Sequence, residues 1–534
     1  MPDQGEAQLV HVGSLDDLAA QGRRLVKVGR KQIALFHGKK GVFACNNRCP
    51  HEGFPLMEGS LAEGCVLTCN WHNWKFDLES GETLVGGDAL RRYPVRLRGD
   101  EIWLDVADPP PAARAAKALE GLRASFRRHE YDQMAREISR LQRSGADPLD
   151  ALRRAIDWTH DHLEFGTTHA HAAAPDWLAL RENLAPEDPA ALVPLVEVVG
   201  NLAWDTLREP AYPYAEGPCA EGQAGYSPEV LVAAIEGEDE AAAVALLRGA
   251  LAEGLGFPDL ERPLATAALA HYQDFGHSVI YVYKTGQLIR HLGPSAAEPL
   301  LLALLRSLVY ARREDLIPEF RAYGGALAAW DGTGRRPVEA CDLTGLGVPQ
   351  ALARTLESSA DPQALFGALL GAAAWQQLHF DLERQGRHDQ PISQNVGWLD
   401  FTHGITFGNA VRVLCGRYPE LWPRGLLQMA CFLGRNARFV DPEQDVEAWA
   451  VPDRDAFFKA AFARLLDHGA PEYIVSCHLV KVLTAVREEV EAAPDAAWVP
   501  TLLAATRRFL ESPLKRKHSL RTAYQAAAFT AIED

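Results

Sequence analysis

Two cysteines and two histidines near the N-terminus have the types and spacing of a metal centre. Cys49 and His51 form a Cys-x-His pair, and 17 residues later Cys69 and His72 form a Cys-x-x-His pair. Thiolates and imidazoles are the usual ligands of zinc and of iron–sulfur clusters. A Cys2His2 zinc site usually keeps its two cysteines together and its two histidines together, followed by a helix. Mixed pairs instead favour a [2Fe–2S] cluster, with two cysteines on one iron and two histidines on the other.

The elements that must hold these four residues are short β-strands. Before residue 108, runs of four to seven β-type residues alternate with glycine turns, which predicts a small antiparallel β domain over 1–107. Both metal-ligand pairs fall in loops between such runs. The runs are LVKVG, QIALFHG, GVFAC, CVLTC, WKFDL, YPVRLRG and EIWLDV.

The chain resembles the Rieske family over about residues 8–107. The resemblance lies in the Cys-x-His…Cys-x-x-His pattern, the series of short predicted strands and the segment HNWKFDLESGE. The resemblance implies that Cys49 and Cys69 hold one iron through thiolates. It implies that His51 and His72 hold the other through ring nitrogens. Neutral imidazoles raise the reduction potential above that of an all-cysteine cluster.

The residues around the cluster loops indicate the subtype. High-potential Rieske proteins of respiratory complexes add two cysteines that form a disulfide, and Phe54 and Trp71 stand at those positions here. The resemblance therefore implies a low-potential centre of ferredoxin or oxygenase type. Cys45 and Cys65 are expected to be small buried strand residues rather than ligands, and Trp74 is expected to be a core aromatic.

The rest of the chain has a different texture. Residues 108–118, DPPPAARAAKA, are expected to be a Pro/Ala linker. Residues 119–534 are rich in Ala, Leu, Arg and Glu at helical spacing, which predicts a large, mostly α-helical domain. The expected fold class is thus multidomain, a small antiparallel β domain followed by that helical domain.

The helical part lacks the catalytic motif of Rieske-type oxygenases, in which two histidines and a carboxylate hold a mononuclear iron. Asp157 and His160 begin that motif, but His162 breaks its spacing. Instead, three segments share the form Asp-aromatic-(Thr/Gly)-His. They begin at Asp157, Asp274 and Asp400. Spacing of three places carboxylate and imidazole on one helix face, and di-iron proteins use a related Glu-x-x-His on bundle helices.

These segments and further helical histidines form a candidate second metal site, for mono- or dinuclear non-haem iron. A His within the apolar IVSCHLVKVL needs a partner, and His162 and His169 are expected on one helix face. Structural hydrogen-bonded pairs and helix caps are the alternative for each Asp-x-x-His. The candidates are His160, His162, His169, His271, Asp274, His277, His379, Asp400, His403 and His478.

Composition excludes several classes of function. The chain has 534 residues and a net charge of −17, which disfavours nucleic acid and anionic membranes as partners. No apolar run is long enough to span a membrane and no signal peptide is evident, so a cytoplasmic protein is expected. Nine cysteines are too few for a disulfide scaffold.

These features predict an oxidoreductase, with a Rieske-linked non-haem iron monooxygenase as the leading hypothesis. A reductase or ferredoxin would donate electrons, and the second iron would activate O2 against a small organic substrate. A homo-oligomer would bring the centres together. The helical domain also resembles questin oxidase-like proteins in its Ala-rich helices and scattered histidines. The alternatives are a ferredoxin-like carrier whose helical domain docks a partner enzyme without binding metal, and a redox sensor.

Overall fold

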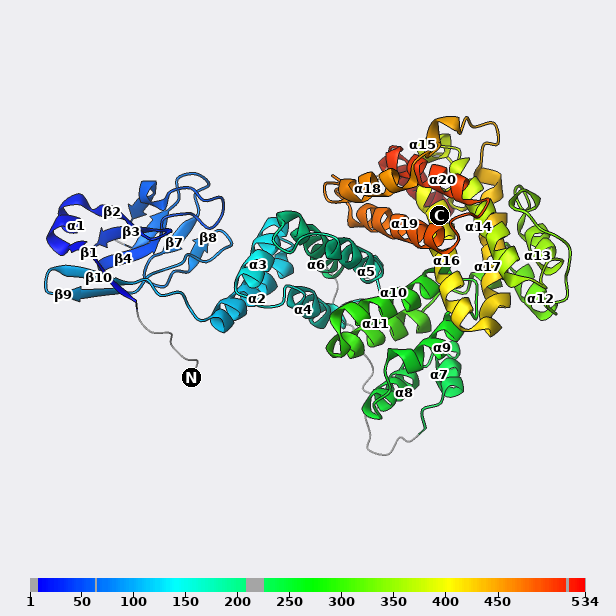
Figure 1. Ribbon diagram of the computed structural model, residues 1–534, viewed down its shortest axis with the longest axis horizontal. Helices are drawn as coiled ribbons and strands as arrows, with labels where there is room; N and C mark the ends of the chain where they lie inside the picture. Colours follow the sequence, from blue (N-terminus) through cyan, green and yellow to red (C-terminus); the bar gives the residue numbers. More distant parts are fainter. Residues whose placement is uncertain (1–7, 63–64, 208–224, 515–517, 534) are drawn as a thin grey trace. The chain divides into compact units, whose positions relative to one another are not determined.

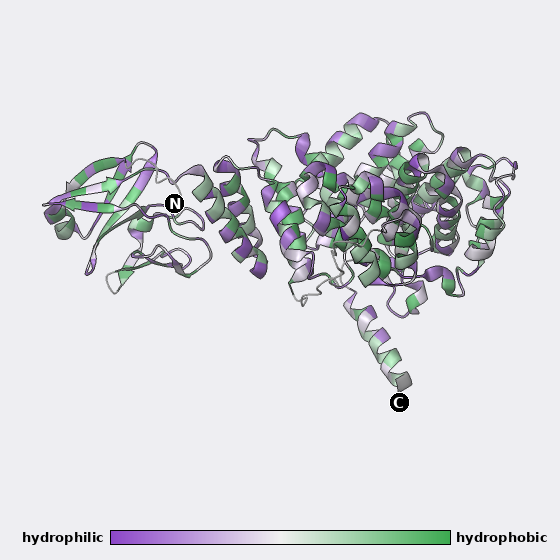
Figure 2. Ribbon diagram, turned by 90° about the horizontal axis from the view of Figure 1, so that it is seen from below, coloured by the Kyte–Doolittle hydropathy of each residue, from purple (hydrophilic) through white to green (hydrophobic). Residues whose placement is uncertain are grey.

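The computed structural model of the chain describes residues 8–62, 65–207, 225–514 and 518–533 (Figure 1). The chain divides into two compact units, Met1–Ala151 and Leu152–Asp534. The first begins with a small antiparallel β domain, and the second is mostly helical, so the predicted fold class is confirmed. Both hydrophobic and hydrophilic residues are found on the strands and on the helices (Figure 2).

The β domain consists of three antiparallel sheets. Their strand orders are β1-β10-β9, β2-β3-β4 and β5-β6-β7-β8. The strands are β1 (Leu9–Ser14), β2 (Arg23–Val28), β3 (Lys31–Gly38), β4 (Gly41–Asn46), β5 (Ser60–Ala62), β6 (Val66–Thr68), β7 (Lys75–Asp77), β8 (Thr83–Val85), β9 (Val95–Arg98) and β10 (Glu101–Asp105), with helix α1 (Leu15–Gln21) after β1.

Strand β3 is buried on both faces and separates two hydrophobic clusters. Side chains alternate across a strand, so Ile33 and Leu35 enter one cluster while Ala34 and Phe36 enter the other. This explains the nearly continuous apolar run of β3. The cluster on the Ala34 side also contains both cysteines of the predicted metal centre.

The expected linker over 108–118 is helical from its fourth residue onward. Helix α2 (Pro111–Arg128) starts with a proline at its first position, where no backbone N–H is needed. It packs against α3 (Tyr131–Arg143), and both helices belong to the first unit, which ends at Ala151 rather than near 107.

One buried carboxylate fastens α3 to the β domain. The side chain of Asp88 is fully buried and accepts hydrogen bonds from Arg136 Nη2 at 2.7 Å and Arg140 Nη1 at 2.5 Å. Gln133 Nε2 donates to the carbonyl of Gly87 at 3.0 Å. The α2–α3 hairpin is therefore a structural extension of the β domain.

The second unit packs its helices around one large apolar core. No helix among the described residues is both long and apolar enough to cross a membrane. The helices are α4 (Asp150–Thr159), α5 (His169–Glu182), α6 (Val193–Thr206), α7 (Pro228–Glu236), α8 (Glu240–Ala252), α9 (Phe257–Ala268), α10 (His277–Leu292), α11 (Ala297–Val309), α12 (Ala322–Ala328), α13 (Val348–Leu356), α14 (Pro362–Leu378), α15 (Glu383–Gly386), α16 (Trp398–Arg417), α17 (Trp422–Asn436), α18 (Arg454–Leu465), α19 (Tyr473–Ala492), α20 (Val499–Glu511) and α21 (Ser519–Glu533).

Four of these helices form a closed ring of contacts. Helix α5 packs on α10 and α19, and α16 packs on the same two helices. Asp176 on α5 binds Lys284 on α10, and each lies seven residues after the first residue of its helix, so these two helices are parallel. We call α5, α10, α16 and α19 the four-helix bundle. It positions the histidines described below.

Loss of the Asp88 carboxylate should loosen the α2–α3 hairpin. Hydrogen bonds to charged groups contribute about 1.5–3 kcal/mol, so Asp88→Asn should lower local stability by roughly that amount. Hydrogen-exchange mass spectrometry on the full chain should show exchange at least tenfold faster in α3. Asp132→Asn, an exposed position on α3, should leave exchange unchanged. Equal protection in both variants would contradict the anchoring role.

Candidate metal centres

The first cysteine loop is held by its own backbone. The N–H of Cys49 donates to the carbonyl of Phe54 at 2.9 Å, and the N–H of Gly53 donates back to the carbonyl of Cys49 at 2.8 Å. Gly53 has φ of 78°, in the left-handed region that glycine adopts most easily. The loop turns sharply enough to place Cys49 and His51 on one side.

The second loop repeats this arrangement. The N–H of Cys69 donates to the carbonyl of Trp74 at 2.8 Å, and the N–H of Asn73 donates to the carbonyl of Cys69 at 2.9 Å. Asn73 takes the place of the glycine with φ of 60°, which asparagine tolerates better than most residues. Two matching loops therefore present one cysteine and one histidine each.

The four side chains converge as the sequence predicts. Cys49 and Cys69 are buried, and the rings of His51 and His72 lie 4.6 Å apart between centroids. His51 Nδ1 is buried without a hydrogen-bond partner, whereas the Nε2 atoms of both rings face Glu52. An orphaned ring nitrogen among two thiols fits the edge of a metal cluster.

Burial also sets the protonation of the Cys49 thiol. It raises the pKa of Cys49 to about 11, so the thiol keeps its proton unless a cation displaces it. Trp74 stacks on the His51 ring at 4.5 Å, and Phe54 stacks on Trp71 at 5.8 Å. The positions that would carry a disulfide in high-potential proteins thus hold an aromatic pair. Cys45 and Cys65 are free and buried, as predicted.

The fold and the site are those of an iron–sulfur β domain, with two cysteines and two histidines as candidate ligands. Residues 8–93 match the Rieske [2Fe-2S] domain family. Through this domain the chain belongs to the Rieske [2Fe–2S] family. The role of the domain is electron transfer.

Known relatives match this part of the chain. The ferredoxin component of the alkene monooxygenase system of Xanthobacter autotrophicus is 27% identical over 114 residues, covering 21% of this chain and 93% of that protein. The ferredoxin subunit of the 3-phenylpropionate/cinnamic acid dioxygenase of Escherichia coli is 33% identical over 81 residues, covering 15% and 76%. Among solved structures, the ferredoxin of carbazole 1,9a-dioxygenase from Nocardioides aromaticivorans is 27% identical and covers 18% of this chain and 97% of its own, with a TM-score of 0.17.

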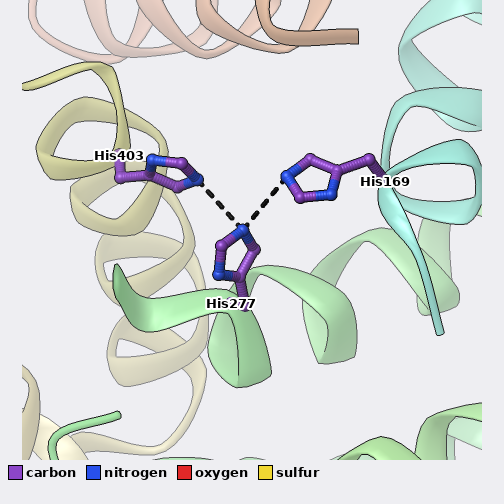
Figure 3. A group of neighbouring side chains, drawn as sticks. All are labelled: His169, His277 and His403. Atoms are coloured by element: carbon purple, nitrogen blue, oxygen red, sulfur yellow. Dashed lines mark hydrogen bonds between the residues drawn. The ribbon is translucent and has the colours of Figure 1, made fainter. Parts of the chain in front are cut away.

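In the second unit, four of the ten predicted second-site residues are neighbours, one from each helix of the four-helix bundle: His169, His277, His403 and His478. Ligand atoms of His169, His277 and His403 all lie within 4.8 Å of one another, and His478 adjoins this group through His403. His277 Nε2 lies 3.1 Å from His169 Nε2 and 3.0 Å from His403 Nε2 (Figure 3). His478 Nε2 lies 3.2 Å from His403 Nε2. We call these residues the four-histidine cluster.

The protons of two of these rings are placed by the backbone. His403 Nδ1 lies 2.5 Å from the carbonyl of Leu399, and His478 Nδ1 lies 2.6 Å from the carbonyl of Ile474. A carbonyl only accepts, so each Nδ1 carries the hydrogen and each Nε2 of the neutral ring exposes a lone pair. Their 3.2 Å contact then brings two lone pairs together, and a cation between the nitrogens would relieve this repulsion.

A proton is a poor candidate for that cation. Burial, together with the neighbouring rings and the charge of Lys481, lowers the pKa of His403 well below its usual value. The pKa of His478 is lowered in the same way, chiefly by burial and then by Lys481. Two nitrogens about 2.1 Å from one metal lie about 3.0 Å apart at a right angle, close to the observed separations.

His271 was expected at this site, but it lies elsewhere. Its ring nitrogens bind Asp315 at 3.0 Å and Glu236 at 3.0 Å. These hydrogen bonds raise the pKa of His271 to about 9, so the ring is a cation at neutral pH and has no lone pair for a metal. His271 therefore forms partly buried ion pairs with Glu236 and Asp315.

His160 and His162 also lie outside the cluster. Helix α4 ends at Thr159 and α5 begins at His169, so His162 and His169 do not share the expected helix face. His160 Nδ1 lies 3.0 Å from the carbonyl of Asp157, and His162 Nδ1 lies 2.8 Å from Asp161. The first Asp-aromatic-Thr-His segment is therefore structural.

The remaining candidates serve helix ends. His379 follows α14, stacks on Trp375 at 4.1 Å and bonds its carbonyl. Asp400 accepts from the N–H of Gly397 at 2.8 Å, which caps α16, and pairs with Arg435 at 2.9 Å. Capping was the alternative considered for this carboxylate. The side chain of Asp274 lies outside the described residues.

Two buried groups on the helices of the bundle escaped the sequence analysis. Lys481 is buried one turn after His478, and His171 is buried with Nε2 lacking a partner. Burial lowers the pKa of His171 to about 4. A lysine inside the apolar run IVSCHLVKVL was the available signal, because an unpaired charge has no reason to sit in a core.

Glu52 should lower the reduction potential of the cluster. Its two oxygens lie 3.9 Å and 3.8 Å from the Nε2 atoms of His51 and His72. A negative charge there opposes electron uptake, so Glu52→Gln should raise the midpoint potential by about 20–60 mV in a redox titration of the full chain. Glu101→Gln, in another sheet, should change it by less than about 10 mV. An unchanged potential in Glu52→Gln would refute the effect.

The His271 ion pair should make stability fall at high pH. Its folded pKa of about 9 exceeds the unfolded value of about 6.5. This contribution is therefore complete below pH 6.5 and disappears as pH rises through 9. Relative to wild type, His271→Gln should lose roughly 1–2 kcal/mol at pH 6.5 and little at pH 9.5, measured from melting temperatures. The control His37→Gln, at an exposed position on β3, should show no such pH-dependent difference.

Proposed function

We propose that the protein is a Rieske-linked oxidoreductase whose helical unit holds a non-haem iron at the four-histidine cluster. Electrons from a reductase or ferredoxin would reach this iron through the Rieske domain. The reaction would use O2 on a small organic substrate, as a monooxygenase does. The observation that carries this proposal is the facing pair of lone pairs on His403 and His478.

The choice of metal follows from the chemistry of both units. Four neutral imidazoles suit zinc, copper, iron or nickel. A Rieske domain moves single electrons, so a redox-active acceptor fits its role and zinc does not. Bound iron would supply one-electron chemistry and O2 activation. Among described residues no carboxylate joins the cluster, which favours one iron over two.

The chain's own residues prepare this site. The carbonyls of Leu399 and Ile474 fix the tautomer of two rings and point their Nε2 atoms inward. His478 and His403 are buried, so bulk water is excluded from their side of the cluster.

A second candidate is a ferredoxin-like carrier with a docking domain. Its support is that the relatives named above are ferredoxin components or subunits, which serve separate oxygenases. The four-histidine cluster would then be a metal-free structural feature. Iron content separates the two functions.

The test is iron and acid-labile sulfide per chain in anaerobically purified protein. We expect about three irons and two sulfides in wild type, because a mononuclear site adds one iron to the [2Fe–2S] cluster. His277→Ala should fall to about two irons with two sulfides retained. His271→Gln and His160→Gln should keep about three irons, since those rings lie outside the cluster.

Two irons and two sulfides in wild type and in every variant would overturn the oxygenase proposal. They would favour the carrier. A loss of sulfide in His277→Ala would show that the substitution damages the Rieske domain, and His403→Asn, which keeps a hydrogen-bonding side chain, would then decide.

A further inference from the structure

We propose that the four-histidine cluster binds a small anion beside its metal, with the Lys481 ammonium as the group that holds it. This inference rests on the metal site proposed above and specifies its ligand class. A carboxylate-bearing substrate or an inorganic monoanion has this chemistry.

Lys481 is the first reason. It is 1% exposed, and its Nζ atom has no hydrogen-bond partner. It follows His478 by three residues on α19 and so lies on the same face of that helix. A buried ammonium without an acceptor is costly unless something fills its place.

The other buried charges of the four-helix bundle have partners. Lys284 binds Asp176 Oδ1 at 2.7 Å, and Glu489 binds Arg412 at 2.7 Å. Asp176 Oδ2 has no hydrogen-bond partner. Asp176 therefore acts on Lys481 only through its charge and not through a hydrogen bond.

The nearby Glu488 is also engaged. Tyr283 donates to it at 2.9 Å and Asn409 at 2.8 Å. Adding a divalent metal held by four neutral rings raises the positive charge further. Asp176 and Asp205 each keep one buried oxygen without a hydrogen-bond partner, but neither accepts a hydrogen bond from Lys481 Nζ, so an anion that enters with the metal can take that place.

The direction of the helices around the cluster also favours an anion there. His169 and His277 are the first residues of α5 and α10, so the positive ends of both helix dipoles face the cluster. His403 and His478 lie in the second turns of α16 and α19. Helix N-termini favour anions and disfavour a bare cation. The unpartnered Lys481 and these helix N-termini therefore both favour a negatively charged ligand.

Azide is the probe, titrated into oxidised, iron-replete full-length protein and followed through the ferric signal by electron paramagnetic resonance. We expect saturable binding in wild type. Lys481→Met keeps the size of the side chain and removes the charge, so it should fold, retain about three irons, and bind azide at least tenfold more weakly. Lys459→Met, exposed on α18, should bind azide as wild type does.

Each other outcome is decisive. Equal azide affinity in wild type and Lys481→Met would overturn the anion proposal and leave the metal site intact. Loss of the third iron in Lys481→Met would give the lysine a role in metal retention and also overturn it. Absence of a third iron from wild type would remove the proposed function itself. Melting of metal-free Lys481→Met at or above the wild-type temperature is expected, since it removes an unpaired buried charge.

Discussion

The contact between His403 Nε2 and His478 Nε2 is the constraint on which the helical unit depends. Each ring gives its only proton to a carbonyl of its own helix, so the two nitrogens meet without a hydrogen between them. In a dry core such a contact is repulsive. The packing of α16 on α19 nevertheless maintains it, and a bound cation would relieve the repulsion.

The bundle surrounds this point with further polar groups. Beyond the histidines, Asp176 and Lys284 link α5 to α10, and Asn409 bridges Glu488 and Glu489 between α16 and α19. Buried polar groups are tolerated only when they are satisfied, and satisfied networks fix one arrangement of their helices. The network thus holds the four rings in register, and Lys481 stands out because it lies outside that network.

The Rieske domain positions its cysteines and histidines through backbone hydrogen bonds in two loops instead of through helix packing. Two loops carry the same pair of backbone hydrogen bonds, and Gly53 and Asn73 take the same left-handed turn in each. Both cysteines belong to the hydrophobic cluster on one face of β3, while the histidines stay partly exposed. Sulfur is shielded and imidazole faces solvent, which suits a centre that exchanges electrons at its surface.

The sequence by itself determined the Rieske centre, since its ligands lie within 24 residues and local turns bring them together. It also predicted the helical texture and, among ten candidates, the four histidines that converge. It did not separate these from His271, whose spacing is equally good but whose partners, Glu236 and Asp315, come from distant segments. Only tertiary structure decided which rings meet, because helix packing brings together residues up to 309 positions apart, from His169 to His478. The spacing of residues within one helix cannot indicate which residues so far apart in the sequence come into contact.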